Sequence, residues 1–177
     1  MDLAATEVYH IKQEAGKMLK TSAQRVQNVL TQFGHPDIVQ ELQETAHTAE
    51  EAARAIGCAV GQIVKSLVFK GQRSNHAFLL LVSGKDRVDL HKAAQIVQEP
   101  LKRADADWVK DYTGYAIGGV PPIGHARPLT TIMDSNLWQY PMVWAAAGHP
   151  YAVFPSTPDH LRAMTRALVH DIHLTQQ

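Results

Sequence analysis

Two neighbouring apolar segments constrain this chain more than any other feature. Ile63–Phe69 and Ala77–Val82 consist mainly of aliphatic residues, and a short turn containing Gly71 and Asn75 separates them. Apolar runs of this length, bounded by turn residues, predict two strands joined as a hairpin. We expect this hairpin to lie at the centre of a sheet.

Helices and further strands are predicted around the hairpin from apolar spacing and capping residues. Helices are expected at 22–33 with Ser22 as N-cap, from Thr48 through a capping box, at 91–98, after Asp105, and after Thr157, with Leu161, Met164 and Leu168 on the buried face of the last. Short strands are expected at 38–42, 88–90, 129–133, 142–147 and 151–154. Direct strand-to-strand connections disfavour an all-parallel sheet. The sequence therefore predicts a mixed α/β (α+β) single domain at 19–177, preceded by an N-terminal extension at 1–18.

Charge and cysteine content exclude several classes of protein. Lys and Arg number 17, and Asp and Glu also number 17, which argues against a basic coat protein or a polybasic membrane binder. A modest basic region, with nine bases and five acids, runs from Lys65 to Lys110. The single Cys58 excludes a disulfide framework and favours the reducing cytoplasm. No transmembrane helix or signal peptide is predicted.

Three segments are candidates for chemistry, each with a structural alternative. Lys65 interrupts an apolar strand, so it either faces solvent or offers a cation to a phosphate or carboxylate. The segment Gly114–Gly124 holds four glycines and two prolines, which suits either a tight turn or a loop whose N–H groups bind a ligand. Gly148-His149-Pro150 is either a hairpin turn or a second wall of the same cleft.

Neither a metal site nor an activated nucleophile is indicated. His170 and His173 are three residues apart, but no zinc motif accompanies them, so we expect no catalytic metal. His125 and His149 are the histidines that lie in glycine-rich turns. Nucleophile-elbow and phosphate-loop motifs are absent, and Cys58 follows a predicted helix at a position typical of packing.

Four motifs in order make the chain resemble a known family. They are His47–Ala53, Gln62–Val68, Thr113–Gly124 and Ala147–Pro150, and the resemblance covers about residues 22–172. Together they resemble the YbaK family, an aminoacyl-tRNA editing domain that is also inserted in bacterial prolyl-tRNA synthetases. The resemblance implies a compact domain around a curved mixed sheet. It also implies hydrolysis of the ester between a wrong amino acid and its tRNA, usually a tRNA for proline, performed in trans without a cofactor.

The resemblance also assigns roles residue by residue. Lys65 matches the strand lysine that binds phosphate near the tRNA 3′ end. The loop Gly118, Gly119, Val120, Pro121, Pro122 matches the one whose amides hold the aminoacyl group. The remaining pocket residues that it implies are His47, Thr48, Gly124, Asp134 and Gly148. His125 and His149 are pocket candidates from their glycine-rich turns, and we treat them as residues of a subgroup of the family. Thr48 has a second interpretation as a helix cap.

Several alternatives remain open at this point. The attacking group is an ordered water or, on a cysteinyl substrate, the substrate's own thiol. Candidate amino acids are alanine, cysteine, serine, threonine and 2-aminobutyrate. Partners would be mischarged tRNA, with prolyl-tRNA synthetase or an elongation factor as candidates, and no membrane. Competing functions are a Cys-tRNA(Pro) deacylase, a non-catalytic tRNA- or synthetase-binding module, and a small-ligand domain with no RNA role.

Overall fold

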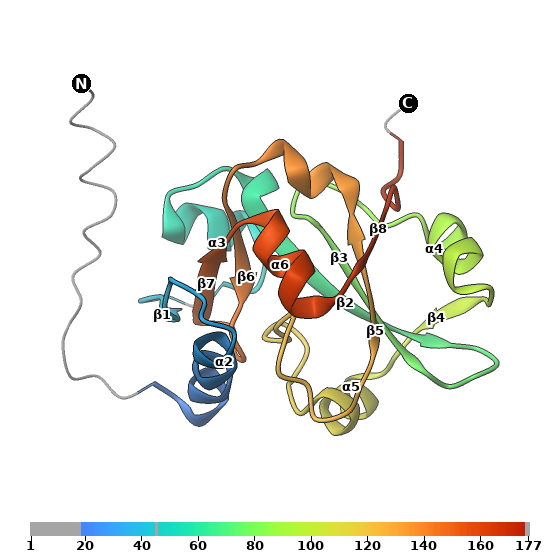
Figure 1. The fold of residues 1–177 in the computed structure, drawn as a ribbon, viewed down its shortest axis with the longest axis horizontal. Helices are drawn as coiled ribbons and strands as arrows, with labels where there is room; N and C mark the ends of the chain where they lie inside the picture. Colours follow the sequence, from blue (N-terminus) through green and yellow to red (C-terminus); the bar gives the residue numbers. More distant parts are fainter. Residues whose placement is uncertain (1–18, 45, 176–177) are drawn as a thin grey trace.

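A computed structural model describes residues 19–44 and 46–175 of the protein, so the expected extension at 1–18 lies outside the described residues. A mixed eight-stranded sheet dominates the described part, and helices pack on both of its faces (Figure 1). The helices are α2 (Thr21–Gln32), α3 (Ala49–Ile56), α4 (Leu90–Val97), α5 (Ala106–Thr113) and α6 (Pro158–Thr165). The strands are β1 (Gln40–Glu41), β2 (Ile63–Gly71), β3 (Ala77–Ser83), β4 (Leu101–Arg103), β5 (Thr130–Asp134), β6 (Val143–Ala146), β7 (Ala152–Ser156) and β8 (Leu168–His170). This architecture confirms the predicted mixed α/β class.

The predicted hairpin is the centre of the sheet. The strand order is β1-β7-β6-β2-β3-β5-β8, with β4 paired to the far end of β2. β2 and β3 are antiparallel over Val64–Lys70, whereas β2 with β6, β3 with β5, and β5 with β8 are parallel. Every residue of β3 is buried, as expected for a strand covered on both faces.

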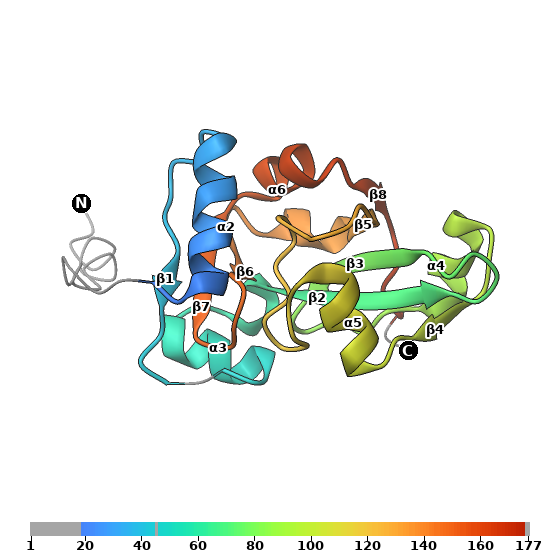
Figure 2. The same ribbon diagram turned by 90° about the horizontal axis from the view of Figure 1, so that it is seen from below.

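Alternate residues of β3 belong to different cores. Leu79 and Leu81 pack in the larger core, to which α2, α5 and α6 contribute Val26, Val109 and Leu161. Leu80 and Val82 pack on the opposite face with Ala93 of α4, and α3 packs on Ile63 nearby. In Figure 2, α2 and α6 accordingly lie on one side of the sheet and α3 on the other.

Several helix ends follow their capping residues as predicted. Thr48 accepts a hydrogen bond from the main-chain nitrogen of Glu51 at 3.1 Å, and the Glu51 carboxylate accepts from the main-chain nitrogen of Thr48, which completes the capping box. Asp105 and Thr157 cap α5 and α6 through their side chains. Gly34 follows α2 with a φ of +65°, as a glycine at the C′ position does.

Some predictions of local structure are wrong in detail. Helix α2 begins at Thr21 with Lys20 as N-cap and no side-chain cap, so Ser22 lies inside the helix. The strand expected at 88–90 is an isolated bridge from Val88 to His173, and Leu90 already begins α4. Leu168 belongs to β8 and is 48% exposed, because α6 ends at Thr165.

The short strands at the margins of the sheet also differ from the prediction. The strand expected at 38–42 shortens to β1, and the three-residue strands β4 and β8 were not predicted.

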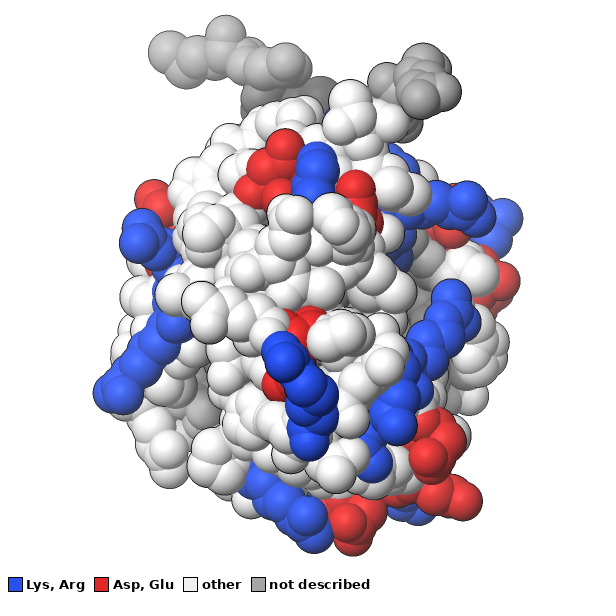
Figure 3. Space-filling model, turned by 90° about the vertical axis from the view of Figure 1, so that its right-hand side faces the viewer, with Lys and Arg blue, Asp and Glu red and all other residues white. Residues whose placement is uncertain are grey.

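The charged surface is mixed. On the side of the molecule that carries α4 and β4, basic and acidic side chains are interspersed, and neither sign forms a continuous patch (Figure 3). Within the described part of the chain, no helix combines the length and the apolar character that a membrane span requires.

Candidate active site

A gap in strand pairing along one edge of β2 creates the site. On the edge opposite β3, β6 pairs with Ile63 and Val64, and β4 pairs only from Phe69 to Gly71. Figure 2 shows β6 at one end of β2 and β4 at the other. Residues 65–68 therefore have no strand partner on this edge among the residues described, and all four are only partly buried.

A cavity of about 440 Å³ lies across this free edge. Its lining comes from β2, the start of α3, β6, β7 and the turn between them, the glycine-rich loop after α5, and Gly84 after β3. Of the residues predicted from the sequence, the cavity brings together His47, Thr48, Lys65, Gly118, Val120 and His149. These residues are up to 102 positions apart, since they span 47 to 149.

The side chain of Lys65 is hydrogen-bonded to the turn that follows β3. Its ammonium nitrogen donates to the main-chain oxygen of Asp86. Burial lowers the pKa of Lys65, and the negative charges of Asp86 and Glu50 partly oppose that effect. The side chain is thus tethered at one point while it lines the cavity, where it offers a positive charge to a ligand.

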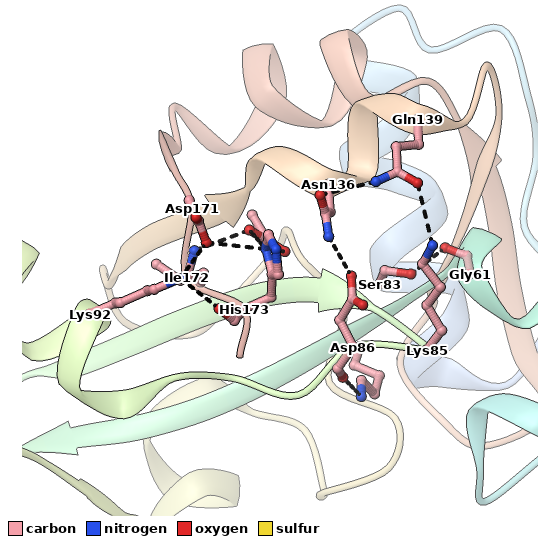
Figure 4. Close-up of polar contacts among 12 residues, drawn as sticks. Gly61, Ser83, Lys85, Asp86, Lys92, Asn136, Gln139, Asp171, Ile172 and His173 are labelled. Atoms are coloured by element: carbon pink, nitrogen blue, oxygen red, sulfur yellow. Dashed lines mark hydrogen bonds and ion pairs between the residues drawn. The ribbon is translucent and has the colours of Figure 1, made fainter. Parts of the chain in front are cut away.

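Asp86 is itself fixed by a chain of hydrogen bonds (Figure 4). Its buried carboxylate accepts from the side-chain nitrogen of Asn136 at 3.0 Å. Asn136 accepts from the Gln139 amide at 3.0 Å, and Gln139 accepts from the Lys85 ammonium at 3.3 Å. The turn that holds Lys65 is therefore attached to the 3-10 helix η2 (Ser135–Gln139).

The glycine-rich loop and the β6–β7 turn form one wall of the cavity. The main-chain nitrogen of Gly148 donates to the carbonyl of Gly119 at 2.9 Å. A Cβ atom on Gly119 would lie 2.5 Å from the Cα of His149. Gly119 and Gly148 thus support the wall, whereas Gly118 and Val120 face the cavity.

His149 is fixed through both ring nitrogens. Its Nδ1 accepts from the main-chain N–H of Tyr151 at 3.2 Å, so the proton resides on Nε2 and is donated to the Glu41 carboxylate at 3.2 Å. Burial lowers the pKa of His149, and Glu41 partly opposes this. Because both ring nitrogens are hydrogen-bonded, His149 contributes to the shape of the cavity wall and is not available as a general base.

The later part of the loop turns away from the cavity. Pro121 and Pro122 are buried, and the His125 Nε2 donates to the Pro121 carbonyl at 2.7 Å. The hydroxyl of Tyr115 donates to the Gly124 carbonyl at 3.0 Å. The residues that line the cavity therefore do not include Pro121, Pro122, Gly124 and His125. These four residues stabilise the loop on the side away from the cavity.

Asp134 lies elsewhere, in a cluster at the end of β5. Its buried carboxylate accepts from the main-chain nitrogen of Ile172 at 3.1 Å and from the His173 ring at 3.0 Å. Asp134, Asp171 and His173 have potential metal-ligand atoms within 4.8 Å of one another, but Ile172, His173 and Lys92 already bind the carboxylates (Figure 4). This cluster fastens the C-terminal strand to β5.

The sequence analysis did not identify Ser66, Glu50 or Asp86 as parts of the site. Ser66 and Glu50 line the cavity, and Asp86 holds Lys65. A signal existed for Ser66, because Lys65-Ser66 places two polar residues in succession within an apolar strand. No local pattern connects Asp86 with Lys65, which lies 21 positions away.

Comparisons with known proteins agree with this geometry. The aminoacyl-tRNA editing domain family matches residues 43–164. The "Uncharacterized protein YwhH" of Bacillus subtilis is 29% identical over 140 residues, which cover 79% of this chain and 88% of that protein. The "Putative Cys-tRNA(Pro)/Cys-tRNA(Cys) deacylase EbsC" of Enterococcus faecalis is 27% identical over 128 residues, which cover 71% and 76% of the two chains.

A solved structure shares the fold as well. It is the "Crystal structure of a putative trans-editing enzyme for prolyl tRNA synthetase", with 50% identity and a TM-score of 0.84, and the match covers 89% of this chain and 100% of that one. The family match includes every segment that lines the cavity. The chain therefore belongs to the aminoacyl-tRNA editing domain family and is an aminoacyl-tRNA deacylase.

Proposed function

We propose that the protein works in the cytoplasm and removes a small wrong amino acid from tRNA(Pro), acting in trans on tRNA released by its synthetase. One observation carries this proposal: Lys65 lines the same cavity at the free edge of β2 as Gly118 and Val120 of the glycine-rich loop. A lysine there can bind a phosphate at the tRNA 3′ end while the cavity holds the aminoacyl group. The names of two relatives, which mention tRNA(Pro) and prolyl-tRNA synthetase, support the choice of tRNA.

In this proposal a water molecule attacks the ester. No cysteine is among the described residues that line the cavity, and both ring nitrogens of His149 are engaged. An aminoacyl ester is already activated, so positioning and oxyanion stabilisation can supply much of the rate. The N–H of Gly119 donates to the Ala116 carbonyl, which leaves the N–H groups of Gly118 and Val120 as the candidate oxyanion donors.

A cysteinyl substrate is the second candidate. Its thiol could attack its own ester, and this chemistry would need no water positioned by the protein. The relative whose name mentions Cys-tRNA(Pro) favours this alternative. A pocket distinguishes side chains that differ by one methylene by only about 1–3 kcal/mol, so activity on two small amino acids is compatible with either chemistry.

The proposal is tested with tRNA(Pro) charged with labelled alanine, cysteine, serine, threonine or 2-aminobutyrate. Release of amino acid is measured for the wild type, for Lys65→Ala and for Lys102→Ala. Lys102 is an exposed lysine of β4 outside the cavity, so it controls for the loss of one positive charge. We expect release of one or two amino acids, with loss of that release in Lys65→Ala only.

Other results would redirect the assignment. Release of cysteine alone would favour the thiol mechanism. Binding of tRNA without any release would favour a non-catalytic binding module, while equal activity in Lys65→Ala and the wild type would contradict the role of Lys65. The same assay with prolyl-tRNA synthetase or an elongation factor added tests whether a partner delivers the tRNA.

A further inference from the structure

At the edge of the cavity, the main chain of β2 has hydrogen-bonding groups that pair with no strand among the described residues. In an antiparallel pair, the N–H and C=O of one residue point to the same side, and those of the next residue point to the other side. Gly71 donates to the His76 carbonyl, and the Ile63 carbonyl accepts from Gly84, so odd-numbered residues of β2 face β3. The peptide groups of Ser66 therefore face the opposite edge, which is the gap between β6 and β4.

The side chain of Ser66 adds a second polar group at the same place. Ser66 lines the cavity, and its Oγ is buried without a hydrogen-bond partner among the described residues. Buried polar atoms are nearly always paired, because an unpaired one costs free energy. A hydroxyl beside a carbonyl that has no partner among the described residues, both next to a cavity, indicates a ligand with several N–H donors.

We propose that Ser66 binds the α-ammonium group of the aminoacyl ester, through its main-chain carbonyl and its Oγ. This inference rests on the proposed function and adds the residue that recognises the amino acid as such. An ammonium has three N–H donors, and a carbonyl can only accept, so the chemistries are complementary. Every aminoacyl ester carries this group at the same position, so Ser66 recognises the common part of the substrate, and the cavity walls select the side chain.

The test uses two ligands that cannot be hydrolysed as esters. They are 3′-alanylamino-3′-deoxyadenosine and its 3′-propionylamino counterpart, which differ only in the α-amino group. Their dissociation constants are measured by calorimetry for the wild type, Ser66→Ala and Glu50→Gln. Glu50 is the carboxylate among the described lining residues, so it is the competing partner for an ammonium.

For the wild type, we expect the alanyl ligand to bind about 10- to 100-fold more tightly than the propionyl ligand. This is the gain in affinity that hydrogen bonds to a charged group typically give. Ser66→Ala should remove much of this preference. The substitution and the loss of the ligand's α-amino group remove the two partners of one hydrogen bond, so their effects on binding should not add. Glu50→Gln should keep it. Ser66→Ala should also melt at or above the wild-type temperature, since it removes an unpaired buried hydroxyl.

The opposite results would overturn the inference. They are equal binding of the two ligands, no binding of either, a preference that is undiminished in Ser66→Ala, or a preference lost in Glu50→Gln. Because binding is read without hydrolysis, these results are distinct from failure of the proposed function. That failure would appear as absence of amino acid release from every charged tRNA.

Discussion

The main-chain nitrogen of Gly148 donates a 2.9 Å hydrogen bond to the carbonyl of Gly119, which joins two loops that lie 29 positions apart in the sequence. A Cβ atom on Gly119 would lie 2.5 Å from the His149 Cα and 2.7 Å from its nitrogen. Both obstacles are main-chain atoms, so a side-chain rotation cannot relieve the contact. This pair of glycines therefore sets the distance between the two halves of the cavity wall.

Gly119→Ala should consequently push these loops apart. We expect a loss of stability of about 1–3 kcal/mol, as for other overpacked sites, and at least a tenfold loss of deacylation. Urea denaturation and amino acid release measure the two effects. Gly34→Ala is the matched control, because Gly34 has a positive φ but open space around it, and it should lose about 1 kcal/mol and no activity. Wild-type activity in Gly119→Ala would contradict the argument.

A second prediction concerns the support of Lys65 by Asp86. Asn136→Ala removes the amide that the Asp86 carboxylate accepts from, so the turn that holds the Lys65 ammonium should become less well positioned. Because Lys65 is proposed to bind phosphate, KM should rise more than kcat falls. Steady-state kinetics on the best substrate from the panel measures this difference.

Gln139→Ala is the control for that experiment. Gln139 binds Asn136 and Lys85 and lies one hydrogen bond farther from Asp86, so its substitution should have a smaller effect on KM. An equal effect of the two variants, or a loss confined to kcat, would show that Asn136 does not act through the position of Lys65.

Thr48 combines two roles that can be separated by substitution. Its hydroxyl oxygen caps α3, and the residue also lines the cavity. Thr48→Ala should lose about 1 kcal/mol of stability. Thr48→Asp should restore the cap, but a carboxylate cannot donate a hydrogen bond to substrate, so stability should return without activity. If Thr48→Asp recovers both stability and deacylation, Thr48 is a cap alone.

The sequence predicted elements whose signals are local. The hairpin of β2 and β3 follows from two apolar runs and their turn, and the start of α3 follows from the Thr48–Glu51 capping box. Short strands at the margins lacked such signals. β4 and β8 contain three residues each and form only by pairing with Phe69–Gly71 and Ile132–Asp134, which are distant in sequence. Leu168 fits a helical spacing, yet α6 ends before it, since Arg166 adopts a left-handed conformation.

Prediction of the site divides in the same way. The sequence analysis placed Lys65, Gly118 and His149 in a pocket, and the structure brings them to one cavity. It also suggested Asp134, which the structure places with Ile172 and His173 instead. The gap between β6 and β4 depends on where two distant strands stop, so no local pattern could reveal the free edge at Ser66.

The last prediction concerns pH. Burial lowers the pKa of His125 below its usual 6.5, and its bond to the Pro121 carbonyl opposes this only in part. The folded protein therefore holds His125 neutral, while the unfolded chain protonates it at the ordinary pKa. Stability is present above the unfolded pKa and is lost as the pH falls from that value through the folded pKa. The window thus lies below about pH 6.5.

His125→Gln should reduce this acid sensitivity. Glutamine can still donate to the Pro121 carbonyl, but it does not titrate, so the difference in stability between about pH 7 and about pH 5 should shrink. Urea denaturation at both pH values measures it. His170→Gln, at an exposed histidine of β8, is the matched control and should keep the wild-type dependence. If His125→Gln also keeps the full wild-type dependence, then the acid sensitivity arises at other groups, of which His149 is the next to substitute, because burial lowers its pKa as well.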